Sequence, residues 1–351
     1  MSTKIIFKSE DEKTFWEYWQ KYIDINKASS RYLKASLDYV VMLSKTNKSF
    51  FKDESFVCTV NNQPAACVFL PIEKKDGLFT VSSSNDGYVD APLVSDQLVE
   101  KEIFKLIDEI ANKNKIAKIM FSINPLENDA KPYNHLQKYG YFDTSIIKYV
   151  IDLKNTENLL KSCRKGHRSD IKDMINNPDF ETFFITEENP DYKIHEEYRN
   201  LQYKCAGRVT KSKELFDIQF EKIKQGNSLL VGLKYHGKNI AFSFFEYNNG
   251  KVIYSSTADD PEYDHFHLYH ILVFKAMEYF KEIGASHIDT GQPSCPSRQF
   301  DYYPDAKQLN IAFFKRGFGG DFMNQFRGIK YYSTTAFQKD LTKFSKEYIS
   351  E

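Results

Sequence analysis

Short apolar runs separated by turn residues predict β-strands in the first half of the chain. The runs at 55–60 and 65–72 flank Asn61 and Asn62, residues favoured in tight turns, so they are expected to form a hairpin. Further apolar runs that predict strands lie at 78–83, 117–123 and 146–153. The last of them is expected to close the first half.

A helix is predicted between the third and fourth of these strands. Val99, Ile103 and Ile107 recur at helical spacing, and Ser95 can cap the helix that they define. The motif Leu136-Gln-Lys-Tyr-Gly140 later indicates a helix end with its glycine at the C′ position.

The second half repeats this order of elements. Helical stretches at 159–175 and 192–224 come first, and three strands joined by tight turns are predicted at 228–235, 241–247 and 252–257. A long amphipathic helix at 265–283 ends at Gly284, and a short strand follows at 287–290. The segments 309–314 and 317–320 take the place that 136–140 has earlier.

A long helix between short strands indicates parallel neighbours, so each half is expected to hold one mixed sheet with a helical crossover. The sequence thus predicts an α/β fold (α+β mixed sheets) in two tandem domains, 1–154 and 155–351. The alternative is coincidence, because any α/β protein alternates strands and helices, but here the repeated order extends over most of the chain.

Charge and cysteine content argue against DNA-binding, membrane-spanning and disulfide-rich secreted proteins. Lys and Arg number 48, as do Asp and Glu, so no global field favours DNA or an anionic membrane surface. The first 13 residues lack a secretory apolar region, and no apolar run reaches the roughly 18 residues of a membrane span. Five scattered cysteines without a CxxC pair predict neither disulfides nor structural zinc. A cytoplasmic protein is expected.

Several short motifs resemble known acyltransferases. Leu136-Gln-Lys-Tyr-Gly-Tyr141 followed by 147–153 resembles the end of a GNAT domain, and the second half resembles the GNAT-like domains of Fem-type nonribosomal peptidyltransferases and their acyl-CoA-using relatives. The motifs that carry the second resemblance are 160–171, Gly237-Lys-Asn-Ile-Ala-Phe242, 276–289 with Gly291, and 314–319. Ala206-Gly-Arg-Val-Thr-Lys211 and Lys315-Arg-Gly-Phe-Gly319 are most similar to acyltransferases of nucleotide-linked amino sugars.

The resemblance implies two tandem GNAT-like domains, with acyl-CoA as a co-substrate in the second. Cofactor contacts are implied for Lys315, Arg316, Gly317 and Gly319. The turn 259–267 lacks the glycines with which GNAT domains hold pyrophosphate, and 86–92 offers only Gly87, so the first domain is expected to bind no cofactor. The long basic helical insertion that engages transfer RNA is missing, which makes tRNA an unexpected partner.

Asp289 and the histidines are the candidate catalytic groups. Asp289 ends a predicted central strand, where α/β sheets bind ligands, and it could hold an amine or accept its proton. A structural role is the alternative. His267 and His270 share a helix face, and one of them could act as a base. No metal site is expected, because no companion carboxylate pair or cysteine is evident beside them and the neighbouring His265.

Four further residues are candidates for substrate binding. Asp259 follows a strand and could bind an ammonium or sugar hydroxyls, and Tyr254 on the same strand could reach the same cleft; a turn and a core ring are the alternatives. Arg208 and Lys211 follow a helix break and could reach a diphosphate, or form a solvated loop. Weaker candidates are Asp260, the basic residues Arg164, Lys165 and Arg168, and Cys295 as a nucleophile.

The expected function is N-acyl transfer from acyl-CoA to the amine of a nucleotide-linked amino sugar. The resemblance implies a dTDP-linked 3-amino-3,6-dideoxyhexose and a product for surface polysaccharide such as lipopolysaccharide or capsule. Two alternatives stay open: a Fem-type transferase that uses aminoacyl-tRNA on a cell-wall precursor, and a non-catalytic scaffold that binds a partner.

Overall fold

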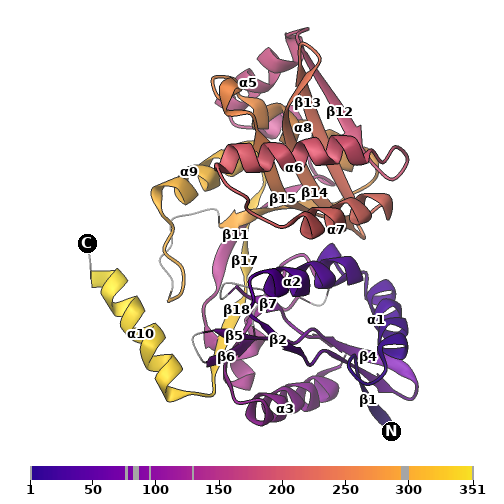
Figure 1. The fold of residues 1–351 in the computed structure, drawn as a ribbon, viewed down its shortest axis with the longest axis vertical. Coiled ribbons are helices and arrows are strands. Elements are labelled where there is room, and N and C mark those ends of the chain that lie inside the picture. The colour runs from indigo at the N-terminus through magenta and orange to yellow at the C-terminus, as the bar shows by residue number, and fades with distance from the viewer. Residues whose placement is uncertain are drawn as a thin grey trace. The chain divides into compact units, whose positions relative to one another are not determined.

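The computed structural model describes residues 2–75, 78–81, 87–94, 96–128, 130–293 and 300–349. The chain divides into two compact units (Figure 1). Unit 1 comprises Met1–Ile146, Ser297–Pro304 and Asn324–Glu351, and unit 2 comprises Ile147–Pro296 and Asp305–Met323. Both units are mixed α/β structures, which confirms the predicted fold class. The division differs from the expected domains 1–154 and 155–351 in two ways: unit 2 already begins at Ile147, and the C-terminal segment from Asn324 returns to unit 1.

Unit 1 contains two sheets and four α-helices among its described residues. The first sheet has the strand order β1 (Thr3–Phe7), β3 (Phe56–Val60), β4 (Gln63–Val68), β8 (Leu93–Val94). The second has the order β10 (Phe142–Asp143), β18 (Arg327–Tyr331), β9 (Ile116–Ser122), β6 (Leu78–Val81), β5 (Pro71–Lys75), β2 (Phe50–Asp53), with β7 (Val89–Asp90) also paired to β9. The helices are α1 (Glu12–Asn26), α2 (Lys34–Thr46), α3 (Gln97–Lys113) and α10 (Thr334–Ile349), and 3-10 turns lie at Ser30–Tyr32 and His135–Tyr139.

The predicted hairpin and the predicted helix of the first half are both present. Strands β3 and β4 pair across the turn at Asn61 and Asn62, and α3 begins after Asp96, whose side chain accepts hydrogen bonds from the first helical amides. Helices α1 and α2 precede these strands and were not among the predicted elements. Both belong to unit 1, and α1 buries Phe15 and Trp19 completely in its core.

Unit 2 is built on one seven-stranded sheet. Its order is β12 (Phe180–Ile185), β13 (Ser228–Tyr235), β14 (Lys238–Asn248), β15 (Lys251–Asp259), β16 (His287–Pro293), β11 (Ile146–Asp152), β17 (Asp321–Gln325). Its helices are α4 (Leu159–Ser162), α5 (Lys165–Asn176), α6 (Tyr192–Ala206), α7 (Lys213–Lys224), α8 (Leu268–Glu282) and α9 (Ala306–Lys315), with 3-10 turns at Pro261–Tyr263 and Arg316–Phe318.

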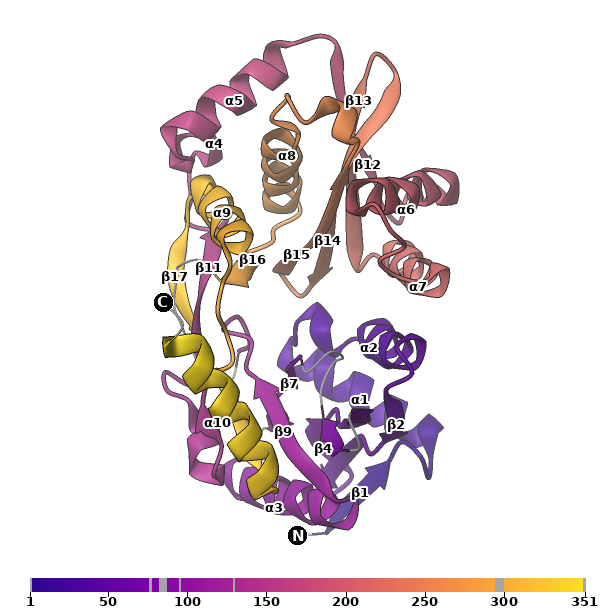
Figure 2. The same ribbon diagram turned by 60° about the vertical axis from the view of Figure 1, so that its left-hand side comes forward.

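A separate apolar core covers each face of this sheet, with α8 on one side and α6 and α7 on the other (Figure 2). Alternation along β14 explains how one strand serves both faces. Ala241 and Phe245 point into the core under α8, whereas Phe242 and Phe244 point into the core under α6 and α7. The pairing with β15 shifts register here, since Phe244 lies opposite Ser256 and Phe245 lies opposite Tyr254.

The closing strands of the two halves are exchanged between the units. β11, which ends the first half of the sequence, pairs with β16 in the sheet of unit 2, with Val150 opposite Asp289. β18, from the end of the second half, pairs with β9 in unit 1, with Arg327 opposite Ser122. The expectation that the run at 146–153 closes the sheet of its own half is therefore wrong, because the pattern of a strand does not specify the edge to which it pairs.

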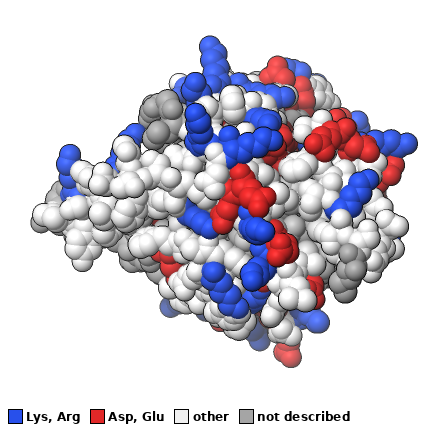
Figure 3. All heavy atoms as spheres, turned by 90° about the horizontal axis from the view of Figure 1, so that it is seen from below, with Lys and Arg blue, Asp and Glu red and all other residues white. Residues whose placement is uncertain are grey.

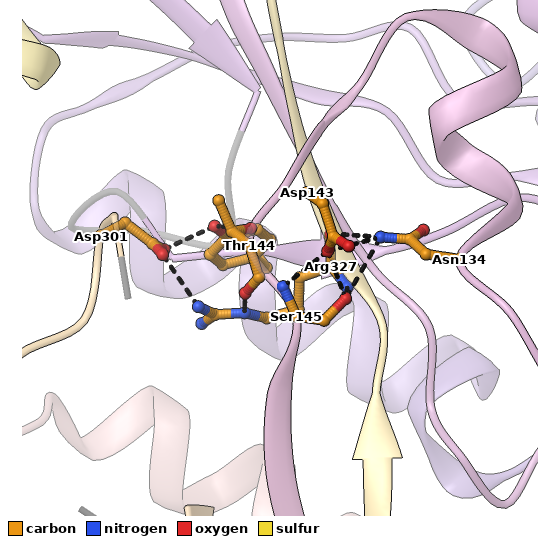
Figure 4. A network of polar contacts seen from close by, with 7 residues as sticks. Asn134, Asp143, Thr144, Ser145, Asp301 and Arg327 are labelled. Atoms are coloured by element: carbon orange, nitrogen blue, oxygen red, sulfur yellow. Dashed lines mark hydrogen bonds and ion pairs between the residues drawn. The ribbon is translucent and has the colours of Figure 1, made fainter. Parts of the chain in front are cut away.

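Polar contacts hold the exchanged strand β18 in unit 1 (Figure 4). The Arg327 guanidinium donates to the Thr144 carbonyl at 2.9 Å and forms an ion pair with Asp301 at 2.9 Å. The Asn134 side chain donates to the Arg327 carbonyl at 2.8 Å. Arg327 is only 8% exposed, so these partners satisfy a buried cation at the start of the strand.

The described surface carries mixed charge. On the face shown in Figure 3, basic and acidic side chains are interspersed rather than separated into fields of one sign. None of the helices in the described ranges combines the length and apolarity needed to cross a lipid bilayer.

Gly328 provides a test of how tightly β18 is packed in unit 1. A Cβ at this position would lie 2.8 Å from the Tyr141 Cβ, so Gly328→Ala should lower the free energy of unfolding by about 1–3 kcal/mol. The matched control is Gly166→Ala in α5, where nothing lies within 4 Å of the added atom and a helix former replaces glycine. Urea denaturation followed by circular dichroism measures both, and equal stability of the two variants would contradict the packing.

Candidate functional site

The candidate site lies where two parallel strands of unit 2 separate. β15 and β16 pair over only three residue pairs, Lys251 with His287, Val252 with Ile288 and Ile253 with Asp289. Beyond these pairs a cavity of about 740 Å³ opens beside β15. Its lining comes from β15, the loop after β15, the start of α8, α9, and single residues of α6 and β16. The parting of the strands thus creates a hollow within the layers of one unit.

Lys315, the last residue of α9, occupies one part of this cavity. Its Nζ donates to the Thr290 carbonyl and lies 4.8 Å from the centre of the Tyr254 ring. Burial lowers the pKa of the Lys315 ammonium to about 8, with Asp289 opposing the shift and Lys148 adding to it. Gly291 lies next to the Tyr254 backbone, where its φ is +77° and a Cβ would lie 2.8 Å from the Tyr254 carbonyl oxygen, so a glycine is required there.

Asp289 lies in the sheet beneath the cavity and is not among the residues that line it. Its carboxylate is fully buried, forms an ion pair with Lys148 of β11 at 2.6 Å, and accepts from the Gly291 amide at 2.8 Å. The carboxylate is therefore separated from the described lining of the cavity. Its charge instead acts on Lys315, whose ammonium it stabilises.

Acidic groups lie in a different part of the same lining. Asp259 accepts a weak hydrogen bond from the Cys205 thiol at 3.3 Å, and Asp264 lies in the loop that follows β15. Burial, together with the neighbouring Asp259, raises the pKa of Asp264 and that of the Tyr269 phenol. Asp259 is five residues from Tyr254, about 16 Å along an extended strand. The cavity therefore offers a cation and carboxylates to separate parts of an extended ligand.

Asp260 has a structural role instead. It is 2% exposed, and Lys204 and Lys238 bind its carboxylate at 2.6 and 3.1 Å. Burial alone would raise its pKa, but these bonds outweigh burial and lower it.

The remaining sequence candidates lie outside the cavity lining. Arg208 is exposed after Gly207, and Lys211 is partly buried with its Nζ 5.9 Å from the centre of the Phe216 ring. Gly317 and Gly319 pack against other parts of unit 2. A Cβ at Gly317 would lie 2.0 Å from the His167 Nε2, and a Cβ at Gly319 would lie 2.8 Å from the Ser162 carbonyl oxygen. These contacts show packing at both glycines.

Arg316 lies with these glycines in the 3-10 turn after α9, its guanidinium 5.8 Å from the centre of the Phe313 ring. His267 and His270 face α5 rather than the cavity, with Asp170 at 3.7 and 3.5 Å. Arg164 and Arg168 donate to backbone carbonyls, Lys165 is exposed at the start of α5, and Cys295 lies outside the described residues.

Several residues of the candidate site were not among the sequence candidates. Lys148 is the buried partner of Asp289, and Tyr269, Asp264 and Lys307 line the cavity. The available signal for Lys148 was its place in the run 146–153 at the same alternate positions as Ile146 and Val150, since a buried charge needs a partner. Nothing comparable marks Tyr269 or Lys307, whose positions depend on how α8 and α9 pack.

Comparisons with known proteins establish the fold. No protein-family model matches the sequence, and no curated protein matches it. Among solved structures, FemX is similar over 97% of this chain and 99% of its own, with a TM-score of 0.66 and 14% identity. L-PGS from Bacillus licheniformis is similar over 83% of this chain and 88% of its own, with a TM-score of 0.55 and 12% identity.

A tandem GNAT protein from the clavulanic acid biosynthesis pathway is similar over 95% of this chain and 99% of its own, with a TM-score of 0.50 and 12% identity. The chain therefore has a tandem GNAT-like fold of the kind found in FemX, as the sequence motifs indicated.

The buried pair between Asp289 and Lys148 predicts a large stability effect. Asp289→Asn removes the Asp289 anion from the buried Lys148 ammonium, which should lower the free energy of unfolding by about 3–5 kcal/mol. The exposed pair of Lys224 and Glu221 is the matched control, and Glu221→Gln should cost less than about 1 kcal/mol. Urea denaturation measures both, and an Asp289→Asn variant as stable as the parent chain would refute the buried pairing.

Proposed function

We propose that this chain is an N-acyltransferase whose reaction takes place in the cavity of unit 2. The observation that carries the proposal is Lys315, a buried amine in a cavity wall whose pKa is close to neutral. Such a group can place a positive charge where negative charge develops during acyl transfer. The volume of about 740 Å³ is within the usual range for small-molecule sites.

The chemistry follows from the balance of bonds and charges. The neutral acceptor amine attacks the carbonyl carbon of an activated acyl group, so a C–N bond forms and the carbonyl oxygen becomes an oxyanion. The Lys315 ammonium stabilises that oxyanion. The tetrahedral intermediate collapses with cleavage of the bond to the leaving group, and the proton lost by the amine neutralises the leaving thiolate or alkoxide.

Asp264 is the group best suited to relay that proton. Asp264 is exposed, but partial desolvation and the neighbouring Asp259 raise its pKa, which makes its carboxylate a better proton acceptor than an ordinary aspartate. Before reaction, the same two carboxylates attract the amine in its ammonium form. In this proposal Asp259 and Asp264 interact with the acceptor amine, and Lys315 interacts with the carbonyl oxygen.

As donor and acceptor we propose acyl-CoA and a nucleotide-linked amino sugar, with the product entering surface polysaccharide. Helix α8 begins beside the cavity, with Tyr269 in both, and the unpaired amides of a first helical turn favour phosphate groups. Two aspartates at the same place, Asp259 and Asp264, weaken that attraction.

An aminoacyl donor is the second candidate, and Asp259 and Asp264 favour it. An aminoacyl ester carries an α-ammonium group beside its carbonyl, and paired carboxylates are suited to hold such a cation. The similarity of the whole chain to FemX in fold is consistent with this alternative.

A donor panel separates the two candidates. Purified chain is incubated with acetyl-CoA or longer acyl-CoA and a set of nucleotide-linked amino sugars, and in parallel with aminoacyl-tRNA and the same acceptors. Mass spectrometry should detect an amide product that requires acyl-CoA. A product formed only from aminoacyl-tRNA would replace the proposed donor and keep the site, whereas no amide from either donor would contradict the proposed function.

Lys315 sets the expected pH dependence. Its ammonium is present below its pKa of about 8 and is lost above it, so kcat should fall as pH rises through about 8. Lys315→Met should lower kcat about 100-fold or more, the effect expected when an oxyanion donor is removed. The matched control is Lys172→Met on the exposed side of α5, with kcat within about twofold of the parent chain.

The arginine variant makes the test specific for charge. Lys315→Arg keeps a cation that stays protonated at every pH of the assay, so any activity it retains should lack the fall above pH 8. A pH profile in Lys315→Arg identical to that of the parent chain would remove Lys315 as the titrating group.

A further inference from the structure

A second cluster of titratable side chains lies between α5 and α8. His167 and Asp170 occupy successive turns of α5, and His270 lies in the first turn of α8. One ligand atom from each of these three residues lies within 4.8 Å of the other two. His267, which precedes α8, adds a fourth donor with its Nε2 3.7 Å from the Asp170 carboxylate. The chain has eight histidines, and three of them meet here.

One ring nitrogen of His167 already has a hydrogen-bond partner, as the second ring nitrogen of a metal-bound histidine generally does. Its Nε2 lies 2.8 Å from the Phe314 carbonyl oxygen, to which a protonated Nε2 donates. The tautomer with this proton leaves the lone pair on Nδ1. Metal-binding histidines generally donate their second ring nitrogen to a carbonyl or carboxylate, which fixes the ring and its tautomer.

His270 faces the same carboxylate through its Nε2. Its side chain is 12% exposed and its Nε2 lies 3.5 Å from the Asp170 carboxylate, so the Nε2 is the ring nitrogen available as a ligand. Burial lowers the pKa of His167 and lowers that of His270 to about 4, so both rings are neutral near pH 7. Neutral imidazole is the form that binds metal.

One cation competes for this place. The Arg164 guanidinium lies 3.3 Å from the His167 Nδ1 and also stacks at 3.9 Å on the Phe313 ring. The stacking does not depend on the imidazole, so Arg164 can release the Nδ1 and keep its contact with Phe313. The exchange replaces one long hydrogen bond with a coordinate bond.

We propose that His167, Asp170 and His270, with His267 as a fourth ligand, bind a divalent transition metal of the zinc class. Two or three imidazoles and one carboxylate suit zinc, whereas magnesium and calcium prefer oxygen ligands. Ligand atoms about 2.0–2.1 Å from a tetrahedral ion lie about 3.3 Å apart. The separation of 3.5 Å between His270 and Asp170 is close to this value. The His267 Nε2 lies 3.7 Å from the Asp170 carboxylate and the His167 ligand atom lies within 4.8 Å of those of Asp170 and His270, so ion binding would draw both rings closer.

The site would link two helices to the cavity wall. The ion would join α5 to α8, and the His167 bond to the Phe314 carbonyl extends that link to the residue before Lys315. Metal binding is a property separate from acyl transfer, so it can be measured without any substrate.

The experiment measures zinc directly on the full chain. Equilibrium dialysis with metal analysis should give one Zn²⁺ per chain, and Zn²⁺ should raise the melting temperature because it binds only the folded state. Mg²⁺ at the same concentration should do neither. Asp170→Asn and His270→Ala should each weaken zinc binding at least tenfold and abolish the thermal shift, with circular dichroism showing that both variants are folded.

Three control variants exclude adventitious zinc. His265→Ala removes an exposed histidine close to the cluster, and Cys205→Ser removes an exposed thiol; both should bind zinc as the parent chain does. Arg164→Gln should bind at least as tightly, because its guanidinium competes for His167. Zinc binding that survives in both Asp170→Asn and His270→Ala, or a parent chain that binds no zinc, would overturn the proposal.

Discussion

The separation of β15 from β16 is the constraint on which the candidate site depends. Parallel strands normally stay in register, because each backbone amide needs a partner. Here the ladder ends at Ile253 and Asp289, and β16 continues against β11 instead. Among the described residues, β15 beyond Ile253 pairs only with β14, and residues of α8 and α9 line the cavity beside it. Side chains and backbone groups that a closed sheet would bury are thereby turned toward a cavity.

The exchanged strand β11 supplies Lys148, the cation that pairs with the buried Asp289 carboxylate in the strand beside the cavity. Two ammonium groups, Lys148 and Lys315, and one carboxylate, Asp289, are withdrawn from water close together. Asp289 takes Lys148 as its direct partner, so Lys315 receives only part of the compensating field. A fully paired lysine would stay protonated and inert, and an unpaired one would lose its proton well below neutral pH. The intermediate balance gives Lys315 its pKa of about 8.

Local patterns in the sequence were enough for the elements and for part of the site, but not for pairing. The hairpin at 55–72, the long helix that became α8, and the α/β class follow from periodicity and turn chemistry, which are local. Tyr254, Asp259 and Lys315 were found and line the cavity. The exchange of β11 and β18, the burial of Asp289 and the meeting of His167 with His270 depend on long-range packing. Arg208 and Lys211 have the charge pattern of many solvated loops, so their sequence does not distinguish a diphosphate-binding pair from a solvated loop.

Helix α9 connects the two clusters of unit 2 through adjacent residues. The Phe314 carbonyl accepts from His167, and the next residue, Lys315, directs its ammonium to the Thr290 carbonyl. A shift at the end of α9 would therefore change both contacts at once, because one peptide unit joins them. Gly317 reinforces the link, since only a residue without a Cβ lets the chain after Lys315 pass directly over the His167 ring. The histidine cluster thus holds in place the backbone from which Lys315 reaches the cavity, whether or not an ion occupies it.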